Sequence, residues 1–471
     1  LQLMAEGLSA AGVPVFLTDI KGDLTGLAEP GTSSEKLLAR TGPLGQDWEP
    51  EAFPLELLSL GGAGRGVPIR TTVTDFGPLL LSKVLGLNDT QESSLALIFH
   101  WADTQGLALL DLKDLRSVIS YLTSDDGKPE LKQIGGISTA TAGVILREIA
   151  ALQAQGADAF FGEPAFDTAD LMRTTADGRG IISSLELPEL SGQPALFSTF
   201  VMWLLADLFG ELPEVGDAEK PRLVFFFDEA HLLFNDASKE FLAQVVQTVR
   251  LIRSKGVGVF FVTQTPKDVP EDVLAQLGSR VQHALRAYTP KDAERLKQSV
   301  KTFPNSPYDL EEVLTTLGTG EAVVTVLSEK GAPSPVAATR LRAPQASMGT
   351  ATAARVDAVV AASTLLPRYR DAVDGESAYE MLTTRMEQQR AAAERRELEE
   401  QRAEELAELE EQLAKERAEE EKRLERERAA AEKEEDRRRA ARQKQLDSLL
   451  SSALRTAGRE ITRTIFGTRR R

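Results

Sequence analysis

The chain has 471 residues, of which 42% are hydrophobic and 27% charged, and its formal net charge is −17. This length predicts two or three domains with a substantial core. The absence of cysteine excludes disulfides and thiol catalysis, and three histidines are too few for a multi-histidine metal site. The acidic balance argues against a protein that coats nucleic acid through overall positive charge. Neither a signal peptide nor an apolar run of about 18 residues is visible, so we expect a soluble cytoplasmic protein.

Residues 1–345 alternate between short apolar runs and helical patterns. Nearly continuous apolar runs are typical of strands buried on both faces of a parallel sheet that is covered by helices. Helical spacing is found over 194–210 and 237–255. This alternation predicts an α/β doubly wound fold. The candidate strands are 13–19, 181–185, 222–228, 258–264, 281–287 and 322–327.

Four other regions depart from this alternation. Residues 85–160 read as helix alone, with a capping box expected at Asp89 and Glu92, and predict a helical insertion. Residues 346–376 are rich in Ala, Ser, Thr and Pro and predict a linker or a loosely attached helix. Residues 377–445 predict a charged helix supported by i,i+4 acid–base pairs, with leucines too sparse for a sustained coiled-coil seam. Residues 446–471 predict an amphipathic basic tail that could dock on a partner protein or an anionic membrane surface.

The strongest motif is the apolar strand candidate that ends in Asp228 and Glu229. Such a strand delivers both acids to the carboxyl edge of the sheet, where ligands bind in open α/β folds. In this Walker B pattern, Asp228 holds the hydration shell of Mg²⁺ and Glu229 accepts a proton from the attacking water. The alternative is a plain strand followed by a helix cap. We favour the catalytic interpretation because two adjacent acids at a buried strand end are costly without a cation.

Two other polar motifs follow strand candidates and should reach the same edge. Gln264 ends the candidate 258–264 and can sense the γ-phosphate of ATP and orient water, or simply cap the strand. Asp19 and Lys21 follow the first candidate and can contact the nucleotide, or Mg²⁺ indirectly. A turn that uses Gly22 for positive φ explains Asp19 and Lys21 nearly as well.

Weaker candidates lie nearer the end of the domain. Arg280 or Arg286 can act as an arginine finger toward a neighbouring subunit, and surface ion pairing is the alternative for each. Gly320 and Glu321 precede a strand candidate and can lie near the nucleotide base or a subunit interface, although a plain turn explains them as well.

A phosphate-binding loop of the form Gly-x-x-x-x-Gly-Lys-Ser/Thr occurs nowhere in the chain. Such a loop normally leads into a helix and then a strand with an acidic end, and residues 1–11 and 13–19 have this order. We therefore expect the loop to be encoded immediately before Leu1. Without it, we expect the chain to bind nucleotide poorly and to lack ATPase activity.

Taken together, these motifs resemble the bacterial HerA-like ATPases, and in particular a HerA-related branch with a charged C-terminal helix. The resemblance covers residues 1–345 and the style of the tail, and it implies a RecA-like P-loop NTPase sheet of the additional-strand class. It also implies binding of ATP and Mg²⁺, ATP hydrolysis and a homo-hexameric ring. The motifs that carry it are VFLTDIKGD (15–23), FFFDEAH (225–231), VTQTP (262–266), RVQHALR (280–286) and TGEA (319–322).

Position by position, the resemblance assigns water-mediated Mg²⁺ coordination to Asp228, water activation to Glu229 and the sensor role to Gln264. It assigns the trans-acting arginine to Arg280 or Arg286. The leading hypothesis is a ring motor of the HerA and FtsK class that moves or remodels a polymer, with double-stranded DNA as the expected substrate. The alternative is an ATP-gated assembly scaffold whose working part is the charged helix, without DNA translocation.

Overall fold

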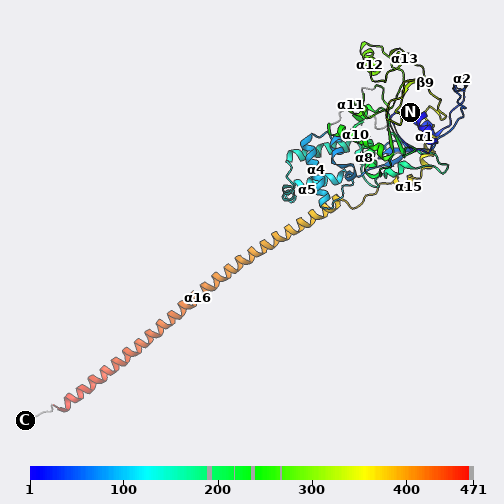
Figure 1. Cartoon of the computed structure of the whole chain (residues 1–471). Coiled ribbons are helices and arrows are strands. Elements are labelled where there is room, and N and C mark those ends of the chain that lie inside the picture. The colour runs from blue at the N-terminus through cyan, green and yellow to red at the C-terminus, as the bar shows by residue number, and fades with distance from the viewer. Residues whose placement is uncertain (188–193, 217, 235–238, 266–267, 466–471) are drawn as a thin grey trace, which may run out of the picture. The chain divides into compact units, whose positions relative to one another are not determined.

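The computed structural model describes residues 1–187, 194–216, 218–234, 239–265 and 268–465 (Figure 1). The chain forms two units, Leu1–Thr383 and Thr384–Arg471. In the part of the chain that the structure describes, no helix is both long enough and apolar enough to cross a membrane.

The first unit is built on a parallel sheet of six strands in the order β3-β2-β4-β1-β5-β6. All five residues of β1, of β4 and of β5 are buried, as expected for strands that are covered on both faces. The predicted α/β fold with a parallel sheet is therefore confirmed. The strands are β1 (Val15–Asp19), β2 (Leu55–Leu60), β3 (Val67–Ile69), β4 (Ile182–Glu186), β5 (Leu223–Phe227) and β6 (Val257–Phe261).

Helices connect and cover these strands. The α-helices are α1 (Gln2–Ala10), α2 (Glu35–Thr41), α3 (Val73–Val84), α4 (Asp89–Thr104), α5 (Leu112–Thr123), α6 (Lys128–Gln133), α7 (Thr139–Ala154), α8 (Pro194–Glu211), α9 (His231–Phe234), α10 (Lys239–Leu251), α11 (Glu271–Leu274), α12 (Pro290–Val300), α13 (Leu310–Thr316), α14 (Ala353–Ala361) and α15 (Leu366–Tyr369). Short 3₁₀ turns are η1 (Leu24–Ala28), η2 (Gly42–Leu44), η3 (Ala157–Ala159), η4 (Thr168–Met172) and η6 (Ile252–Lys255).

The stretch between β3 and β4 contains the helices α3 to α7, which include the region that the sequence predicts as helix alone. Its interior includes a stacked pair, Trp101 and Tyr121, with ring centroids 5.7 Å apart. The capping box of α4 is formed by Asn88 and Gln91, one residue earlier than the expected Asp89 and Glu92. Asn88 is the better cap because its extended backbone directs the side chain at the N–H of the third helical residue.

The central core joins segments that are distant in the sequence. Leu1, which precedes α1, and Met4 and Leu8 of α1 pack against a cluster that includes residues of β1, β4 and β5. Ala346, from the region predicted as a linker, belongs to the same cluster. Tyr369 from this region is fully buried. Residues 346–376 are thus packed into the first unit over at least part of their length.

The strand candidates 281–287 and 322–327 do not join the parallel sheet, which corrects that expectation. They contribute to a separate antiparallel sheet in the order β7-β8-β9, made of β7 (Arg280–Gln282), β8 (Glu321–Thr325) and β9 (Ala337–Arg340). Helices α12 and α13 supply a small core for this sheet through Leu296, Leu310 and Leu314. Apolar runs of this length do not distinguish parallel from antiparallel pairing.

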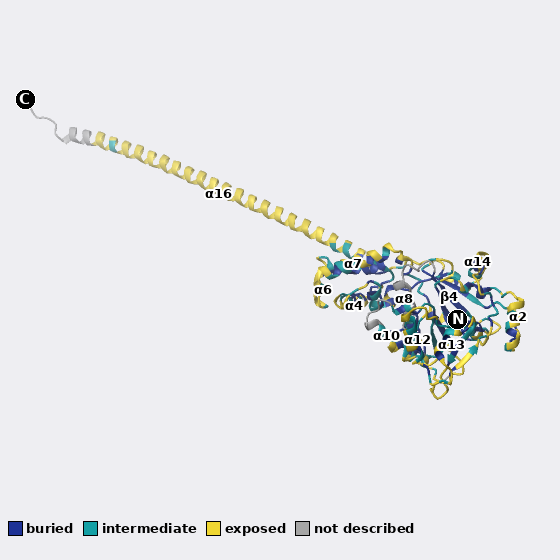
Figure 2. Cartoon of the chain, turned by 90° about the horizontal axis from the view of Figure 1, so that it is seen from above, coloured by how far each residue is buried: buried dark blue, intermediate teal, exposed yellow. Residues whose placement is uncertain are grey.

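The described part of the second unit belongs to α16 (Ala378–Ile465), a helix of 88 residues that is about 130 Å long. Nearly all of its described side chains are exposed, including the leucines of the charged region (Figure 2). Ion pairs at i,i+4 spacing, such as Glu411–Lys415 at 2.7 Å, support the isolated helix. The predicted long charged helix is confirmed. Of the predicted basic tail, residues 466–471 lie outside the described residues.

Gly180, two residues before β4, lies against the backbone of Val13 and leaves no space for a side chain. A Cβ there would lie 2.1 Å from the carbonyl oxygen of Val13, whereas nothing lies within 4 Å of a Cβ at Gly7 in α1. We expect Gly180→Ala to lower the free energy of unfolding by about 1–3 kcal/mol because backbone has to move. The control Gly7→Ala should raise it by roughly 0.5–1 kcal/mol. Urea unfolding of both variants tests this, and equal stability of Gly180→Ala and the wild type would contradict the packing.

Candidate active site

Acidic side chains gather where neighbouring parallel strands end. Asp19 is the last residue of β1, Glu186 is the last residue of β4, and the two are direct partners in the strand register. Asp228 and Glu229 follow β5, which pairs with β1 on its other side. The topology therefore brings the predicted Walker B acids to the same edge as Asp19, and it adds Glu186, which the sequence reading did not single out.

Asp228 is held at this edge through its backbone. Its N–H donates a hydrogen bond to the hydroxyl of Thr18 at 3.0 Å, and Thr18 is a buried residue of β1. Burial raises the pKa of Asp228, the N–H of Glu229 lowers it, and the charge of Glu229 raises it further. A half-buried carboxylate next to a second acid is electrostatically prepared for a cation.

Glu229 is the centre of the site. Its side chain is 11% exposed, and one carboxylate oxygen lies 3.1 Å from Nζ of Lys21. Gln264 places its Nε2 3.3 Å from both carboxylate oxygens, and Nδ1 of His231 lies 3.4 Å from one of them. Three of the residues predicted from sequence, Lys21, Glu229 and Gln264, are thus in direct contact.

The backbone of Glu229 is unusual. With φ of 46° it is the one non-glycine residue with positive φ in the described parts of the chain. Such a conformation costs about 1–3 kcal/mol and persists only where the surroundings enforce it. Hydrogen bonds on both sides do so, because Asp228 N–H donates to Thr18 and Ala230 N–H donates to the carbonyl of Val262 at 2.9 Å.

Asp19 builds the turn that carries Lys21. One of its carboxylate oxygens accepts the N–H groups of Lys21 and Gly22, at 3.1 and 2.6 Å, and the other accepts the N–H of Leu24 at 2.8 Å. Burial raises the pKa of Asp19, and these hydrogen bonds oppose the shift. The Lys21 side chain is 61% exposed, and its hydrogen bond with Glu229 is the main cause of its raised pKa.

The segment that carries Gln264 is fixed by a carboxylate that the sequence reading missed. Asp268 accepts hydrogen bonds from the hydroxyls of Thr263 and Thr265, at 2.6 and 2.9 Å, and from the N–H of Thr265 at 3.1 Å. Gln264 lies between these two threonines, so Asp268 sets the position from which its amide reaches Glu229.

The leading end of α1 lies near these acids. Leu1, which directly precedes this helix, packs against the core cluster that includes Phe226 of β5. The start of the helix therefore lies beside β5, the strand that leads into Asp228.

The remaining predicted residues have other partners. Arg280 donates to the side chains of Thr302 and Ser299, at 2.6 and 2.8 Å, and stacks on Phe303. Arg286 donates to the carbonyls of Thr315 and Leu317. Glu321 pairs with Arg340 at 3.3 Å, and the carbonyl of Gly320 accepts from Arg40 at 2.9 Å. The contacts of Arg280, Arg286 and Gly320 connect the small antiparallel sheet to its surroundings, and the Glu321–Arg340 pair joins two of its strands. The roles predicted for these four residues, at a subunit boundary or near the nucleotide, stay predictions.

The carboxylates at this edge of the sheet suit Mg²⁺ only in combination with a nucleotide. Among the described residues, no group of three or more Asp, Glu or His side chains could hold a metal by itself. Mg²⁺ is usually held by one or two carboxylates together with water and substrate phosphates. Asp228 alone fits this second arrangement, so the site suits a magnesium–nucleotide complex rather than a protein-only metal centre.

Two signals in the sequence could have revealed more of the site. Thr18 is a polar residue in an otherwise apolar strand, and such a residue is buried only if it has a hydrogen-bond partner. The second signal is the run of polar residues in β4. Ser183, Ser184 and Glu186 are all buried there, and the Ser184 hydroxyl donates to Glu186 at 2.8 Å. His231 and Asp268 offered no comparable signal, since their contacts depend on how the loops after β5 and β6 fold.

Burial, followed by the charge of Asp19, raises the pKa of Glu186 from 4.5 to about 8. Between these values the folded protein retains a proton that the unfolded chain releases, so the free energy of unfolding falls as the pH rises through this window. We expect Glu186→Gln to remove this contribution and to be more stable than the wild type at pH 8. Urea unfolding at pH 5 and pH 8 measures it, with Glu214→Gln on the exposed surface as control. An unchanged pH dependence in Glu186→Gln would contradict the assignment.

Comparisons with known proteins identify the family of this chain. The family described as Helicase HerA-like C-terminal matches residues 1–471. A probable helicase of Methanocaldococcus jannaschii, MJECL08, is 33% identical over 118 residues, which are 24% of this chain and 21% of that protein. The DNA double-strand break repair helicase HerA of Sulfurisphaera tokodaii is 32% identical over 101 residues, 21% of this chain and 19% of the relative. The matches thus span about a fifth of the length of these curated relatives.

Solved structures show more distant likenesses. The plasmid coupling protein TrwB in complex with an ATP analogue has 14% identity and a TM-score of 0.48, covering 74% of this chain and 84% of TrwB. VirB4 of Thermoanaerobacter pseudethanolicus has 14% identity and a TM-score of 0.44, covering 69% and 81%. The match over residues 1–471 shows the family: the chain belongs to the Helicase HerA-like C-terminal family, as the motifs predict.

Proposed function

We propose that this chain is the ATP-hydrolysing core of a ring motor of the HerA-like class that acts on double-stranded DNA. The observation that carries the proposal is the contact of Glu229 with Lys21 and Gln264 at the end of β5, beside Asp228. Family membership supports the same class of protein. Two of the curated relatives are helicases named for DNA double-strand break repair.

In this proposal each side chain has a separate task. Asp228 would hold Mg²⁺ through water, and the bound ion would supply positive charge to the phosphates of ATP. Glu229 accepts a proton from the water that attacks the γ-phosphate, and Gln264 orients that water. Lys21 is exposed enough to turn from Glu229 toward a phosphate, which frees the carboxylate to act as the base. Arg280 or Arg286 supplies positive charge to the site of a neighbouring subunit in a homo-hexamer.

The phosphate cradle is the part that these residues do not supply. The sequence holds no Gly-x-x-x-x-Gly-Lys-Ser/Thr loop. Among the described residues β6 pairs with β5 alone, and four of its five residues are only half-buried. The outer edge of β6 can therefore accept another strand, and we propose that the strand leading into a phosphate-binding loop adds there.

The base assignment predicts a specific kinetic effect. In a protein that includes a phosphate-binding loop, Glu229→Gln should lower the rate of ATP hydrolysis by about 10²–10⁴-fold, because a general base contributes that much. ATP should stay bound rather than leave as product, which a filter-binding assay with radiolabelled ATP measures. Glu219→Gln, at an exposed position, is the control, and the 471-residue chain without a loop should show negligible turnover. Full activity of Glu229→Gln would refute its role as the base.

A second function is favoured by α16, whose 88 residues form a self-supporting, exposed helix suited to an ATP-gated assembly scaffold. The two functions predict different responses to DNA. For the motor, double-stranded DNA should stimulate ATP hydrolysis several-fold, and the stimulation should fall steeply with salt because phosphate contacts release counterions. A steady-state ATPase assay across a salt series measures this. Hydrolysis that is indifferent to DNA, together with nucleotide-dependent assembly that is lost when residues 384–471 are removed, would favour the scaffold.

A further inference from the structure

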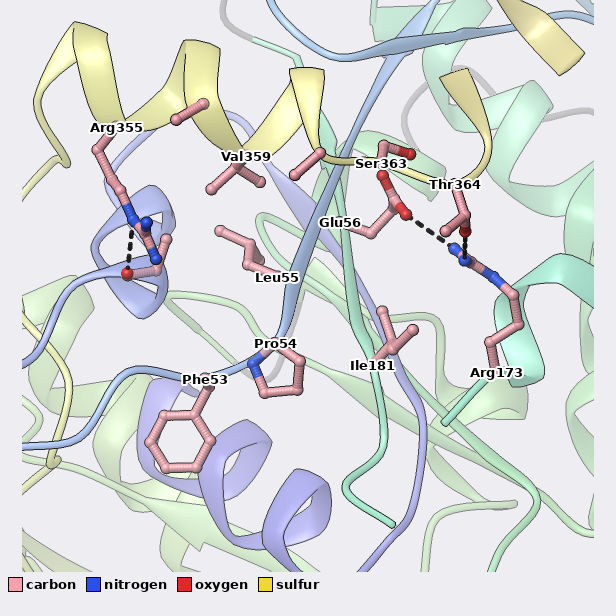
Figure 3. A pocket seen from close by; sticks show the side chains of 13 residues that line it. Phe53, Pro54, Leu55, Glu56, Arg173, Ile181, Arg355, Val359, Ser363 and Thr364 are labelled. Carbon is pink, nitrogen blue, oxygen red and sulfur yellow. Dashed lines mark hydrogen bonds and ion pairs between the residues drawn. The ribbon is translucent and has the colours of Figure 1, made fainter. Parts of the chain in front are cut away.

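A pocket of about 300 Å³ lies between the first residues of β2 and β4 and the helix α14 (Figure 3). Leu55 begins β2 and Ile181 directly precedes β4, so the pocket is at the amino-terminal edge of the parallel sheet. Asp228 and Glu229 follow the carboxyl end of β5, at the opposite edge. The pocket is therefore distinct from the candidate active site.

The walls of the pocket combine apolar and polar side chains. Phe53, Pro54 and Leu55 line one side, and Ala358 and Val359 of α14 line another. The volume is at the lower end of the range of about 300–1,000 Å³ that is typical of ligand pockets. A molecule the size of a small metabolite fits such a space, and its apolar part would contact these side chains.

One end of the pocket holds a carboxylate with an unused oxygen. The side chain of Glu56 is 6% exposed, and its Oε2 accepts a hydrogen bond from Arg173 at 2.8 Å. Its Oε1 is buried and has no hydrogen-bond partner among the described residues. The other two nitrogens of Arg173 donate elsewhere, to Thr364 and to the carbonyl of Asp170. A buried acceptor without a donor costs about 1–3 kcal/mol, and more if it is charged.

A donor that enters the pocket can reach this oxygen. Figure 3 shows the free oxygen of Glu56 beside Ser363, which lies just after the end of α14. The Ser363 hydroxyl accepts from the N–H of Leu365 at 3.1 Å. Ser363 is half-buried and lines the pocket, and we infer that its side chain rotates when a donor reaches Glu56.

The other end of the pocket holds a cation with unused donors. Arg355 of α14 donates from Nε to the carbonyl of Ala28 at 3.0 Å. Within the described ranges its two terminal nitrogens have no acceptor, and the residue is exposed. The two free terminal nitrogens of a guanidinium present parallel N–H donors, which suit a carboxylate. Figure 3 shows Leu55 and Val359 between Arg355 and Glu56.

We propose that this pocket binds a small zwitterion, an amino-acid-like molecule whose carboxylate pairs with Arg355 and whose ammonium group donates to Glu56. Its apolar spacer lies on Leu55 and Val359. A simple anion would leave the Glu56 oxygen without a donor, and a simple amine would leave Arg355 without an anion. A zwitterion satisfies both ends and fits the apolar middle.

The test uses the full chain and three probes that each contain a straight chain of six carbon atoms. ε-Aminocaproate carries both charged groups, caproate lacks the ammonium group, and hexylamine lacks the carboxylate. We expect ε-aminocaproate to bind saturably in ligand-observed NMR or calorimetry, and the other two to bind about tenfold more weakly or worse. No saturable binding of ε-aminocaproate, or equal binding of the three probes, would overturn the proposal.

Variants locate the binding without disturbing the buried Glu56–Arg173 pair. Ala358→Leu places a side chain in the pocket from the exposed face of α14 and should abolish binding, whereas Ala354→Leu, on the same helix but outside the pocket, should leave it unchanged. Arg355→Gln should weaken ε-aminocaproate to the level of hexylamine. Circular dichroism confirms that all three fold. Binding that survives Ala358→Leu would place the ligand elsewhere and refute the site.

Discussion

The desolvation of carboxylates at one edge of the parallel sheet is the constraint on which the site depends. Burial is the largest cause of the raised pKa of Asp19, Glu186 and Asp228. Each acid is stabilised differently: Asp19 accepts three backbone N–H groups, and Glu186 retains a proton to about pH 8. The pKa of Asp228 is lowered by one backbone N–H, that of Glu229, and by the charge of Lys21. It is therefore the acid with most to gain from a bound cation.

The same edge stores backbone strain at Glu229, the residue that we propose as the general base. Glu229 can hold φ of 46° because its two neighbours are hydrogen-bonded into adjacent strands, through Thr18 on β1 and Val262 beyond β6. The cost of this backbone conformation is offset by hydrogen bonds to the buried sheet rather than by contacts within the loop. The stacked rings of Phe226 and Phe260, 4.8 Å apart, show how tightly β5 and β6 are joined just before the site. The position of the carboxylate is thus a property of the fold.

Sequence patterns predict those parts of this structure that are local. The apolar run of β5 and its two acids are contiguous, so their position needed no knowledge of the rest of the chain. β2 was missed because Glu56 interrupts its apolar pattern, and the burial of this residue depends on Arg173, which is distant in sequence. The antiparallel pairing of β7 with β8 was missed for the same reason, since the partner strand decides it.

In the candidate site too, positions that depend on local sequence could be predicted, and contacts between distant segments could not. Lys21 and Gln264 were expected at the carboxyl edge because each follows a strand, and the structure brings both to Glu229. The sequence does not show that Asp19 serves mainly to form the turn beneath Lys21, because three backbone N–H groups have to converge on it. Nor does it show that Arg280 stacks on Phe303, a contact that closes only when β7 and α12 pack.

The outer edge of β6 limits what the described residues can do by themselves. An apolar edge strand with unpaired backbone groups is a liability that proteins normally cover. Phe260 and Phe261 are only half-buried, although they directly continue the core of β5 through ring contacts. Asp19 ends β1, Asp228 directly follows β5 and Gln264 follows β6, so these side chains approach the site from one side. In the proposed function, the phosphate cradle approaches from the other side, on a strand that adds to the outer edge of β6. The same added strand would bury Phe260 and Phe261 more fully.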